Sequence, residues 1–214
     1  MTYLIFRKMS GGFMFSLVVL AAGKSERFGR NKMLIDVLGK PLIRGVVENA
    51  LNSRVDEVIV VLGYMAKEIE EVLKDLPCKV VYNRNFEEGM SSSVKIGVSK
   101  ISKTAEAVLI LPGDYPLVTA EDIDRVISKF RETGASIVIA SYKGRPGHPI
   151  LFSQKLFNEI LKISEKEQGL KAVVRKHGEE VVLAETNSPG VLMDVDTEEH
   201  FKKVIRFLNK SYSE

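Results

Sequence analysis

The sequence predicts an α/β fold in three layers, with a mostly parallel β-sheet covered by helices on both faces. Two observations support this prediction. Short apolar runs rich in β-branched residues alternate with stretches whose apolar residues recur at helical spacing, as expected of strand–helix–strand units. Most of the apolar runs also lack alternating polar residues, which is typical of strands buried on both faces.

The predicted strands and helices alternate along residues 15–134. Strands are expected in the apolar runs at 15–22, 55–63, 78–83 and 105–113. Helices are expected at 41–53, 66–76, 91–102, 119–134 and, near the end of the chain, 198–210. The stretches TAED (119–122) and TEEH (197–200) place a hydroxyl residue before acidic residues, which is a common way for a helix to begin.

The alternation changes after residue 134. Strands at 135–142 and 148–153 flank the Gly- and Pro-rich stretch KGRPG, which predicts a small antiparallel element at an edge of the sheet. Further strands are expected at 179–185 and in GVLMDVD (190–196). No linker-like stretch interrupts residues 15–214, so we predict a single domain there. Residues 1–14 are interpreted as an N-terminal extension, in which Met9 and Met14 offer alternative starts.

The composition argues against several classes of protein. The 214 residues carry a net charge of only +3, which does not favour binding to nucleic acid or to a membrane surface. No apolar run approaches the roughly 20 residues of a membrane span. The single cysteine, Cys78, cannot form a disulfide within the chain, which is typical of a reducing compartment. We therefore expect a cytoplasmic protein that acts on small molecules.

The loop after the first strand has features of two nucleotide-binding motifs and fits neither. In LVVLAAGKSERFG (17–29), Gly-Lys-Ser matches the end of a P-loop, but the first glycine of that motif would fall at Val18, inside the strand. The dinucleotide fingerprint G-x-G-x-x-G fails because Ser25 stands at its second glycine. An NAD-dependent oxidoreductase is therefore disfavoured.

The same loop nevertheless suits a triphosphate. Its turn is built from the small residues Ala21, Ala22 and Gly23. Small residues let a base or phosphate approach the backbone, whose free amides bind phosphate oxygens. Arg27 and Lys32 add two cations, which neutralise the phosphates before a nucleophile approaches. Ser25 has two possible roles, to bind phosphate or to cap a short helix.

Carboxylates follow the later predicted strands. Asp114 comes directly after the strand at 105–113, and Asp194 and Asp196 alternate along the segment 190–196, so they point to the same side if it is extended. Ligands of such sheets bind at the carboxyl ends of the strands, and Mg²⁺ prefers carboxylate ligands. The sequence therefore predicts a Mg²⁺ site formed by Asp114, Asp196 and Asp194. Capping of a turn or helix is the alternative role for these residues.

Five groups of motifs resemble one family. LAAGKSERFGRNK (20–32) resembles the signature L-A-[AG]-G-x-S-x-R-[MF]-G-x-x-K of the MobA/MocA-like nucleotidyltransferases. YNRNFEEGMSSSVKIG, LPGDYPLVT and GRPGHPILF resemble, in the same order, that family's N-x-x-x-x-x-G-[ML]-x-x-S, metal-binding and R-x-G-H-P segments. EQGLKAVVRKHGEEV and MDVDTEEHF resemble its closing motifs. The resemblance spans about residues 16–208 and implies a nucleotidyltransferase with a nucleotide-diphospho-sugar transferase (Rossmann-like) fold.

The resemblance also implies substrates and cofactor. Ala22 and the Gly-His-Pro segment are more similar to the molybdenum cofactor cytidylyltransferase branch of the family. This branch implies CTP as the nucleotide, a molybdopterin-type phosphorylated acceptor and Mg²⁺ as the cofactor. A molybdoenzyme or its maturation partner is the implied recipient of the product. Tyr115 stands where this branch commonly has Gln, which bears on the contacts to the acceptor.

Site residues follow from the same resemblance. Arg27, Lys32 and Asp114 are implied to be catalytic. The residues implied to bind the nucleotide are Ala21, Ala22, Gly23, Ser25, Asn83, Gly89 and Ser93. For the last three, a loop leading into a helix capped by Ser91 is an equally good explanation. Arg145 and His148 are implied to contact the acceptor, and simple turn structure is the alternative for His148.

Three other functions stay open from the sequence. The first is guanylyl transfer to a molybdopterin, and the second is transfer to a sugar or polyol phosphate on the same fold. The third is a nucleotide-binding accessory protein without turnover, which we would expect to lack the metal-binding carboxylates. Asp114 and Asp196 are both present, which favours an enzyme.

Overall fold

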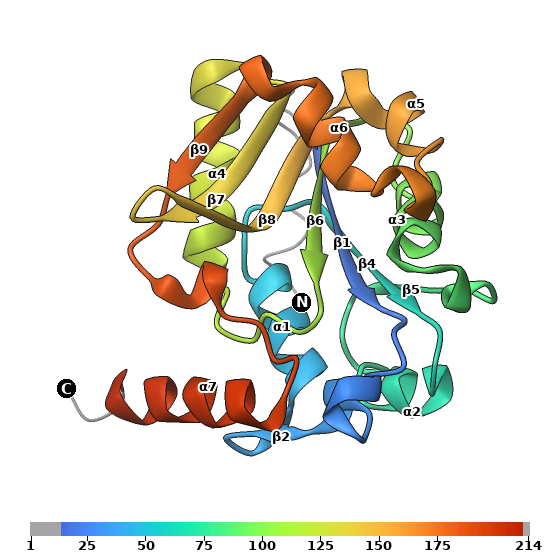
Figure 1. The fold of residues 1–214 in the computed structure, drawn as a ribbon, viewed down its shortest axis with the longest axis vertical. Helices are drawn as coiled ribbons and strands as arrows, with labels where there is room; N and C mark the ends of the chain where they lie inside the picture. The colour runs from blue at the N-terminus through green and yellow to red at the C-terminus, as the bar shows by residue number, and fades with distance from the viewer. Residues whose placement is uncertain (1–13, 212–214) are drawn as a thin grey trace.

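The computed structural model describes residues 14–211, which form a seven-stranded sheet (Figure 1). The strand order is β5-β4-β1-β6-β8-β7-β9, and every neighbouring pair is parallel except the two pairs that include β8. The strands are β1 (Met14–Ala21), β4 (Glu57–Leu62), β5 (Lys79–Tyr82), β6 (Ala105–Pro112), β7 (Ile137–Tyr142), β8 (Arg145–Ser153) and β9 (Val181–Glu185). The short strands β2 (Asp36–Val37) and β3 (Lys40–Pro41) pair separately as an antiparallel ladder.

Helices cover both faces of the sheet, which confirms the predicted three layers. The helices on one face are α1 (Leu42–Leu51), α2 (Ala66–Glu71) and α4 (Ala120–Thr133), with α7 (Glu198–Ser211) joining the same apolar cluster. The helices on the other face, grouped together in Figure 1, are α3 (Met90–Ser99), α5 (Phe157–Ile160) and α6 (Leu170–Lys176). Successive residues of β1 alternate between the two clusters, since Leu17 and Val19 belong to the first and Val18 and Leu20 to the second.

The predicted antiparallel element is present, but its expected place at an edge of the sheet is wrong. β8 lies inside the sheet, between β6 and β7, and its residues Leu151 and Phe152 are fully buried. The edge strand on this side is β9, which pairs parallel to β7. A hairpin pattern in the sequence establishes that two strands are antiparallel neighbours, but it does not establish what pairs with their outer sides.

The strand predicted at residues 190–196 is also wrong. Pro189–Leu192 forms a 3-10 turn, and the chain then leads into α7 outside the sheet. Pro189 begins the turn, and the side chain of Ser188 accepts a hydrogen bond from the amide of Gly190 at 3.1 Å. This local hydrogen bond competes with strand pairing, and the fixed backbone angle of proline favours the turn.

The carboxyl ends of β4, β1 and β6 meet at one edge of the sheet. Their parallel register pairs Ala21 with Leu62 and Leu20 with Pro112, so the loops that follow these strands begin side by side. Ligands of open parallel sheets bind at such an edge.

Two further findings concern the ends of the chain and membranes. The predicted N-terminal extension lies outside the described residues except for Met14, which begins β1, so the division into extension and single domain stays a prediction. Within residues 14–211, no helix combines the length and apolar character needed to cross a membrane.

Candidate active site

The loop after β1 is a compact turn anchored in the core. The backbone amide of Phe28 donates to the carbonyl of Ser25 at 2.9 Å, and the hydroxyl of Ser25 accepts from the amide of Lys32 at 3.2 Å. Ser25 therefore braces the loop through its hydroxyl. Phe28 is buried and meets Phe201 of α7 edge-on, with ring centroids 6.3 Å apart. The loop thus presents Arg27 and Lys32 from a fixed base.

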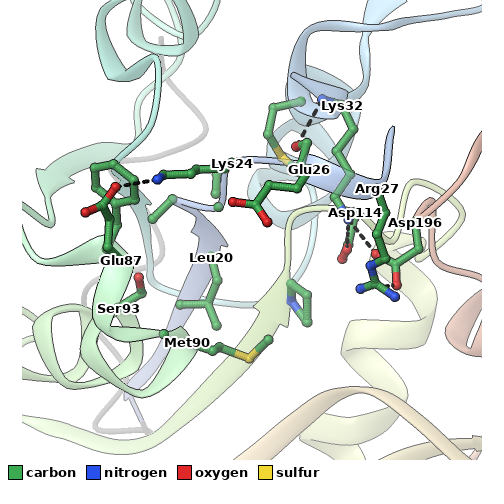
Figure 2. Close-up of a pocket in the computed structure, with 18 residues that line it drawn as sticks. Leu20, Lys24, Glu26, Arg27, Lys32, Glu87, Met90, Ser93, Asp114 and Asp196 are labelled. Atoms are coloured by element: carbon green, nitrogen blue, oxygen red, sulfur yellow. Dashed lines mark hydrogen bonds and ion pairs between the residues drawn. The ribbon is translucent and has the colours of Figure 1, made fainter. Parts of the chain in front are cut away.

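Lys32 and Arg27 pair with carboxylates from distant parts of the chain. Lys32 Nζ lies 2.6 Å from Asp114 Oδ2 and 2.8 Å from Asp196 Oδ1. Arg27 donates to the other oxygen of Asp196 at 2.9 Å (Figure 2). Burial alone would lower the pKa of Lys32, but the two carboxylates outweigh it and raise the pKa, so the ammonium stays charged. Burial likewise opposes ionisation of Asp196, but Lys32 and Arg27 lower its pKa.

Asp114, Asp194 and Asp196 form a cluster that suits a divalent cation. One oxygen from each lies within 4.8 Å of the others. Burial, followed by the charges of Asp196 and Asp114, raises the pKa of Asp194, because like charges disfavour ionisation. Asp114 Oδ1 is buried and has no hydrogen-bond partner among the described residues. A buried carboxylate oxygen without a partner is costly, and coordination by Mg²⁺ would satisfy it. The residues present therefore fit a metal ion.

A cleft of about 620 Å³ runs from this cluster to the start of α3 (Figure 2). Figure 2 shows Arg27, Lys32, Asp114 and Asp196 at one end, and Ser93 and Glu87 at the other. Most of the residues predicted for the site line the cleft. They are Ala21, Ala22, Gly23, Ser25, Arg27, Lys32, Gly89, Ser93, Asp114 and Asp196.

Asn83 does not line this cleft; it lines a second pocket with Arg84 and Phe86. The side chain is buried, and its amide group donates to the hydroxyls of Ser92 and Ser93 at 2.7 and 2.9 Å. Its carbonyl oxygen accepts from the amide of Asn85 at 2.9 Å. Asn83 therefore ties the loop 83–89 to the first turn of α3. The predicted cap of this helix is wrong, because α3 begins at Met90 with Gly89 before it and Ser91 within its first turn.

The two residues predicted to contact the acceptor lie at the same edge of the sheet, outside the lining of the cleft. His148 packs edge-on against Tyr115, with ring centroids 4.8 Å apart. Burial lowers the pKa of His148 to about 4, so the imidazole is neutral at physiological pH. Arg145 is exposed in the β7–β8 hairpin, paired with Tyr142. His148 therefore contacts Tyr115, the residue that follows Asp114, whereas Arg145 lies at the periphery of the site.

Sequence reasoning missed several side chains of the cleft. Glu26, Phe86, Glu87 and Met90 line it, and Figure 2 shows the carboxylate of Glu26 directed between the two ends. Lys24 and Glu87 form an ion pair at the end of the cleft near Ser93, and both side chains are exposed. For Glu26, its place between Ser25 and Arg27 was the only signal in the sequence. For Phe86 and Glu87 no local pattern distinguished them from solvated loop residues.

A family model described as a MobA-like NTP transferase domain matches residues 17–181, which is most of the chain and contains the loop after β1, the start of α3 and Asp114. The chain belongs to this family. This match confirms the predicted resemblance of the chain to the MobA/MocA-like nucleotidyltransferases. The predicted fold class is confirmed as well.

Relatives of this MobA-like protein carry different names. It is 27% identical over 185 residues to the molybdenum cofactor cytidylyltransferase of Escherichia coli, covering 86% of this chain and 92% of that one. It is 30% identical over 152 residues to a probable molybdenum cofactor guanylyltransferase of Thermococcus sibiricus, covering 70% and 74%. It spans only 29% and 23% of the length of the bifunctional GlmU proteins of Acholeplasma laidlawii and Aquifex aeolicus, at 34% and 37% identity.

A solved structure shares the fold. The manganese complex of Rv0371c from Mycobacterium tuberculosis superimposes with a TM-score of 0.74, at 22% identity over 90% of this chain and 98% of that one. At this level of identity the likeness concerns the fold alone.

Proposed function

We propose that this MobA-like protein transfers CMP from CTP to a phosphorylated small-molecule acceptor of the molybdopterin type and releases pyrophosphate. The observation that carries the proposal is the buried, unpartnered oxygen of Asp114, next to two further carboxylates and two cations at one end of a nucleotide-sized cleft. Such an arrangement suits phosphoryl chemistry, in which positioning and charge stabilisation supply most of the catalysis.

Arg27 and Lys32 bind the triphosphate in this proposal. Both cations are paired with Asp196, and Lys32 also with Asp114. Asp114 and Asp196, with Asp194 as a third ligand, would hold Mg²⁺, which would supply positive charge to the phosphate oxygens. Lys32 and Arg27 turn from the carboxylates to the phosphates of the nucleotide. A phosphate oxygen of the acceptor attacks the α-phosphorus in line, the bond to the β-phosphate oxygen breaks, and pyrophosphate leaves with the electron pair.

The acceptor enters from the side of Tyr115 and His148. These two rings contact each other beside Asp114. The imidazole of His148 is neutral, so it adds no charge to this side of the site. An ionised phosphate nucleophile needs no general base, so His148 is assigned to positioning. Arg145, exposed at the periphery, is assigned a weaker contact with the acceptor.

The choice of CTP rests on Ala22 and on the name of the Escherichia coli relative. Guanylyl transfer to the same kind of acceptor is the alternative, because a relative of similar identity is named as a probable guanylyltransferase. We further propose that the product passes to a molybdoenzyme or its maturation partner.

A panel of nucleotides tests the proposal. Binding of CTP, GTP, ATP and UTP is measured by calorimetry with Mg²⁺ and again with EDTA, and pyrophosphate release is then followed with the preferred nucleotide and a molybdopterin acceptor. We expect Mg²⁺-dependent CTP binding and pyrophosphate release. Preference for GTP would replace the cytidylyl assignment with the guanylyl one. Tight binding of a nucleotide without pyrophosphate release would favour the accessory protein, and binding of none of the four would overturn the proposal.

A further inference from the structure

The start of α3 is capped by a side chain from a distant segment. Gly89, which precedes the helix, has no side chain to cap it. Instead, Oε1 of Glu165 accepts a hydrogen bond from the backbone amide of Ser91 at 2.6 Å, across 74 residues of sequence. The free amides at a helix start attract anions. Here a carboxylate of the protein itself already occupies that position.

The contact between the two segments is close at both ends. Gly89 has a φ of 99°, and a Cβ there would overlap the side chain of Glu165. A Cβ on Gly169 would lie 2.7 Å from the hydroxyl of Ser91. The segment 164–169 is itself closed by a hydrogen bond from the amide of Gly169 to the carbonyl of Ser164 at 2.9 Å. Glu165 is therefore held against α3 by a compact turn.

At the capped end of α3, the cation that the loop after β1 contributes is Lys24, and it is already paired with Glu87. Gly89, Met90 and Ser93 line the cleft there, whereas Arg27 and Lys32 lie at the opposite end with the carboxylate cluster. A second negative group is unfavourable next to the carboxylate of Glu165. The triphosphate therefore belongs at the end with Arg27 and Lys32, and the uncharged nucleoside belongs at the start of α3.

We propose that Glu165 is a positioning residue for the nucleoside: by capping α3 it holds Gly89 to Ser93 in the arrangement that contacts the nucleoside part of the substrate. The inference rests on the proposed function, because it requires a nucleoside triphosphate in the cleft. Glu165 acts through the backbone of α3 and does not itself contact the phosphates.

Two ligands separate the ends of the cleft. CTP contains both the nucleoside and the triphosphate, whereas inorganic tripolyphosphate probes the phosphate end alone. Both are titrated with Mg²⁺ by calorimetry into the wild type, E165A, E165Q and E165D. The matched control is E167A, because Glu167 lies in the same turn and accepts only from the hydroxyl of Ser164, at 3.0 Å, among the hydrogen bonds of the described residues.

We expect E165A to weaken CTP binding about tenfold, equivalent to about 1.4 kcal/mol, and to leave tripolyphosphate binding unchanged. E165Q retains an oxygen that accepts from the Ser91 amide, so its CTP affinity should stay within about threefold of the wild type. E165D shortens the side chain and should lose CTP affinity by a few-fold without affecting tripolyphosphate. E167A should match the wild type with both ligands.

Other outcomes overturn the inference. Unchanged CTP binding in E165A would show that the cap does not position the nucleoside. An equal loss for CTP and tripolyphosphate would show general damage to the site. If E165A does not fold, the same comparison is made with E165D, and equal losses of both ligands there overturn the inference. If the wild type binds tripolyphosphate but no nucleotide, the proposed function fails and the inference fails with it. A selective loss of CTP affinity in E165A would support both the proposed function and the inference.

Discussion

The two ends of the cleft are built on different principles. At the cationic end, Lys32 and Arg27 hold Asp114 and Asp196 in ion pairs at 2.6 to 2.9 Å. In the proposed reaction, phosphates and a metal ion replace these partners. At the start of α3, the end proposed for the nucleoside, the polar side chains form hydrogen bonds within the protein. Asn83 holds Ser92 and Ser93, and Glu165 caps α3. The first end is arranged for chemistry, and the second for fixed geometry.

The difference also explains why Lys24 is not equivalent to Lys32. Lys24 and Glu87 form an ion pair with 41% and 66% of their side chains exposed, whereas only 13% of the Lys32 side chain is exposed. Exposed ion pairs contribute little because water screens them. We therefore expect Lys32, which is withdrawn from water next to the carboxylates, to contribute more to the site than Lys24.

The largest expected effect is at the cationic end, in Asp114→Asn. The substitution preserves the size of the side chain and removes the charge that a metal ion requires. We expect pyrophosphate release to fall at least about 100-fold, as for other losses of charge stabilisation in a transition state. Binding of free cytidine, which probes only the nucleoside end, should be unchanged. Near-normal turnover in this variant would place the chemistry elsewhere.

The next effect compares two lysines of one loop, in Lys32→Met and Lys24→Met. Loss of a charged hydrogen-bond donor to the triphosphate costs about 1.5 to 3 kcal/mol, so Lys32→Met should weaken CTP binding by about tenfold or more. Lys24→Met should change it by less than about threefold, because its ion pair is exposed. Calorimetry measures both. Equal losses in the two variants would contradict the distinction between buried and exposed cations.

The smallest effect is a dependence of metal binding on pH. Burial and the neighbouring carboxylates raise the pKa of Asp194 above the ordinary value of about 3.9, so this carboxyl takes up a proton at a higher pH than usual. A metal ion must displace that proton. The affinity for Mn²⁺, measured by electron paramagnetic resonance, should therefore decrease by a few-fold as the pH falls through the raised pKa. Asp194→Asn should bind Mn²⁺ more weakly and lose this part of the pH dependence. An unchanged profile in that variant would exclude Asp194 as a ligand.

The sequence predicted local structure correctly where that structure depends on one segment of the chain. The run 15–22 without polar alternation became β1, an interior strand of the sheet, because both of its faces are covered. Thr119 caps α4 through a reciprocal pair of hydrogen bonds with Asp122, as the TAED pattern predicts. The glycine and small residues of the loop after β1 line the cleft, because they directly follow a parallel strand.

The sequence by itself determined the alternation of the main strands and helices in residues 15–134, the membership of the MobA-like family, and the place of Asp114 directly after a strand. Only the tertiary structure decided that β8 lies inside the sheet, that Asn83 is bonded to Ser92 and Ser93, and that Glu165 caps α3. It also decided that Lys32 meets Asp196 across 164 residues. The physical reason is that strand patterns and turns depend on neighbours along the chain, whereas these contacts depend on which strands and segments pack together, and no local pattern specifies that.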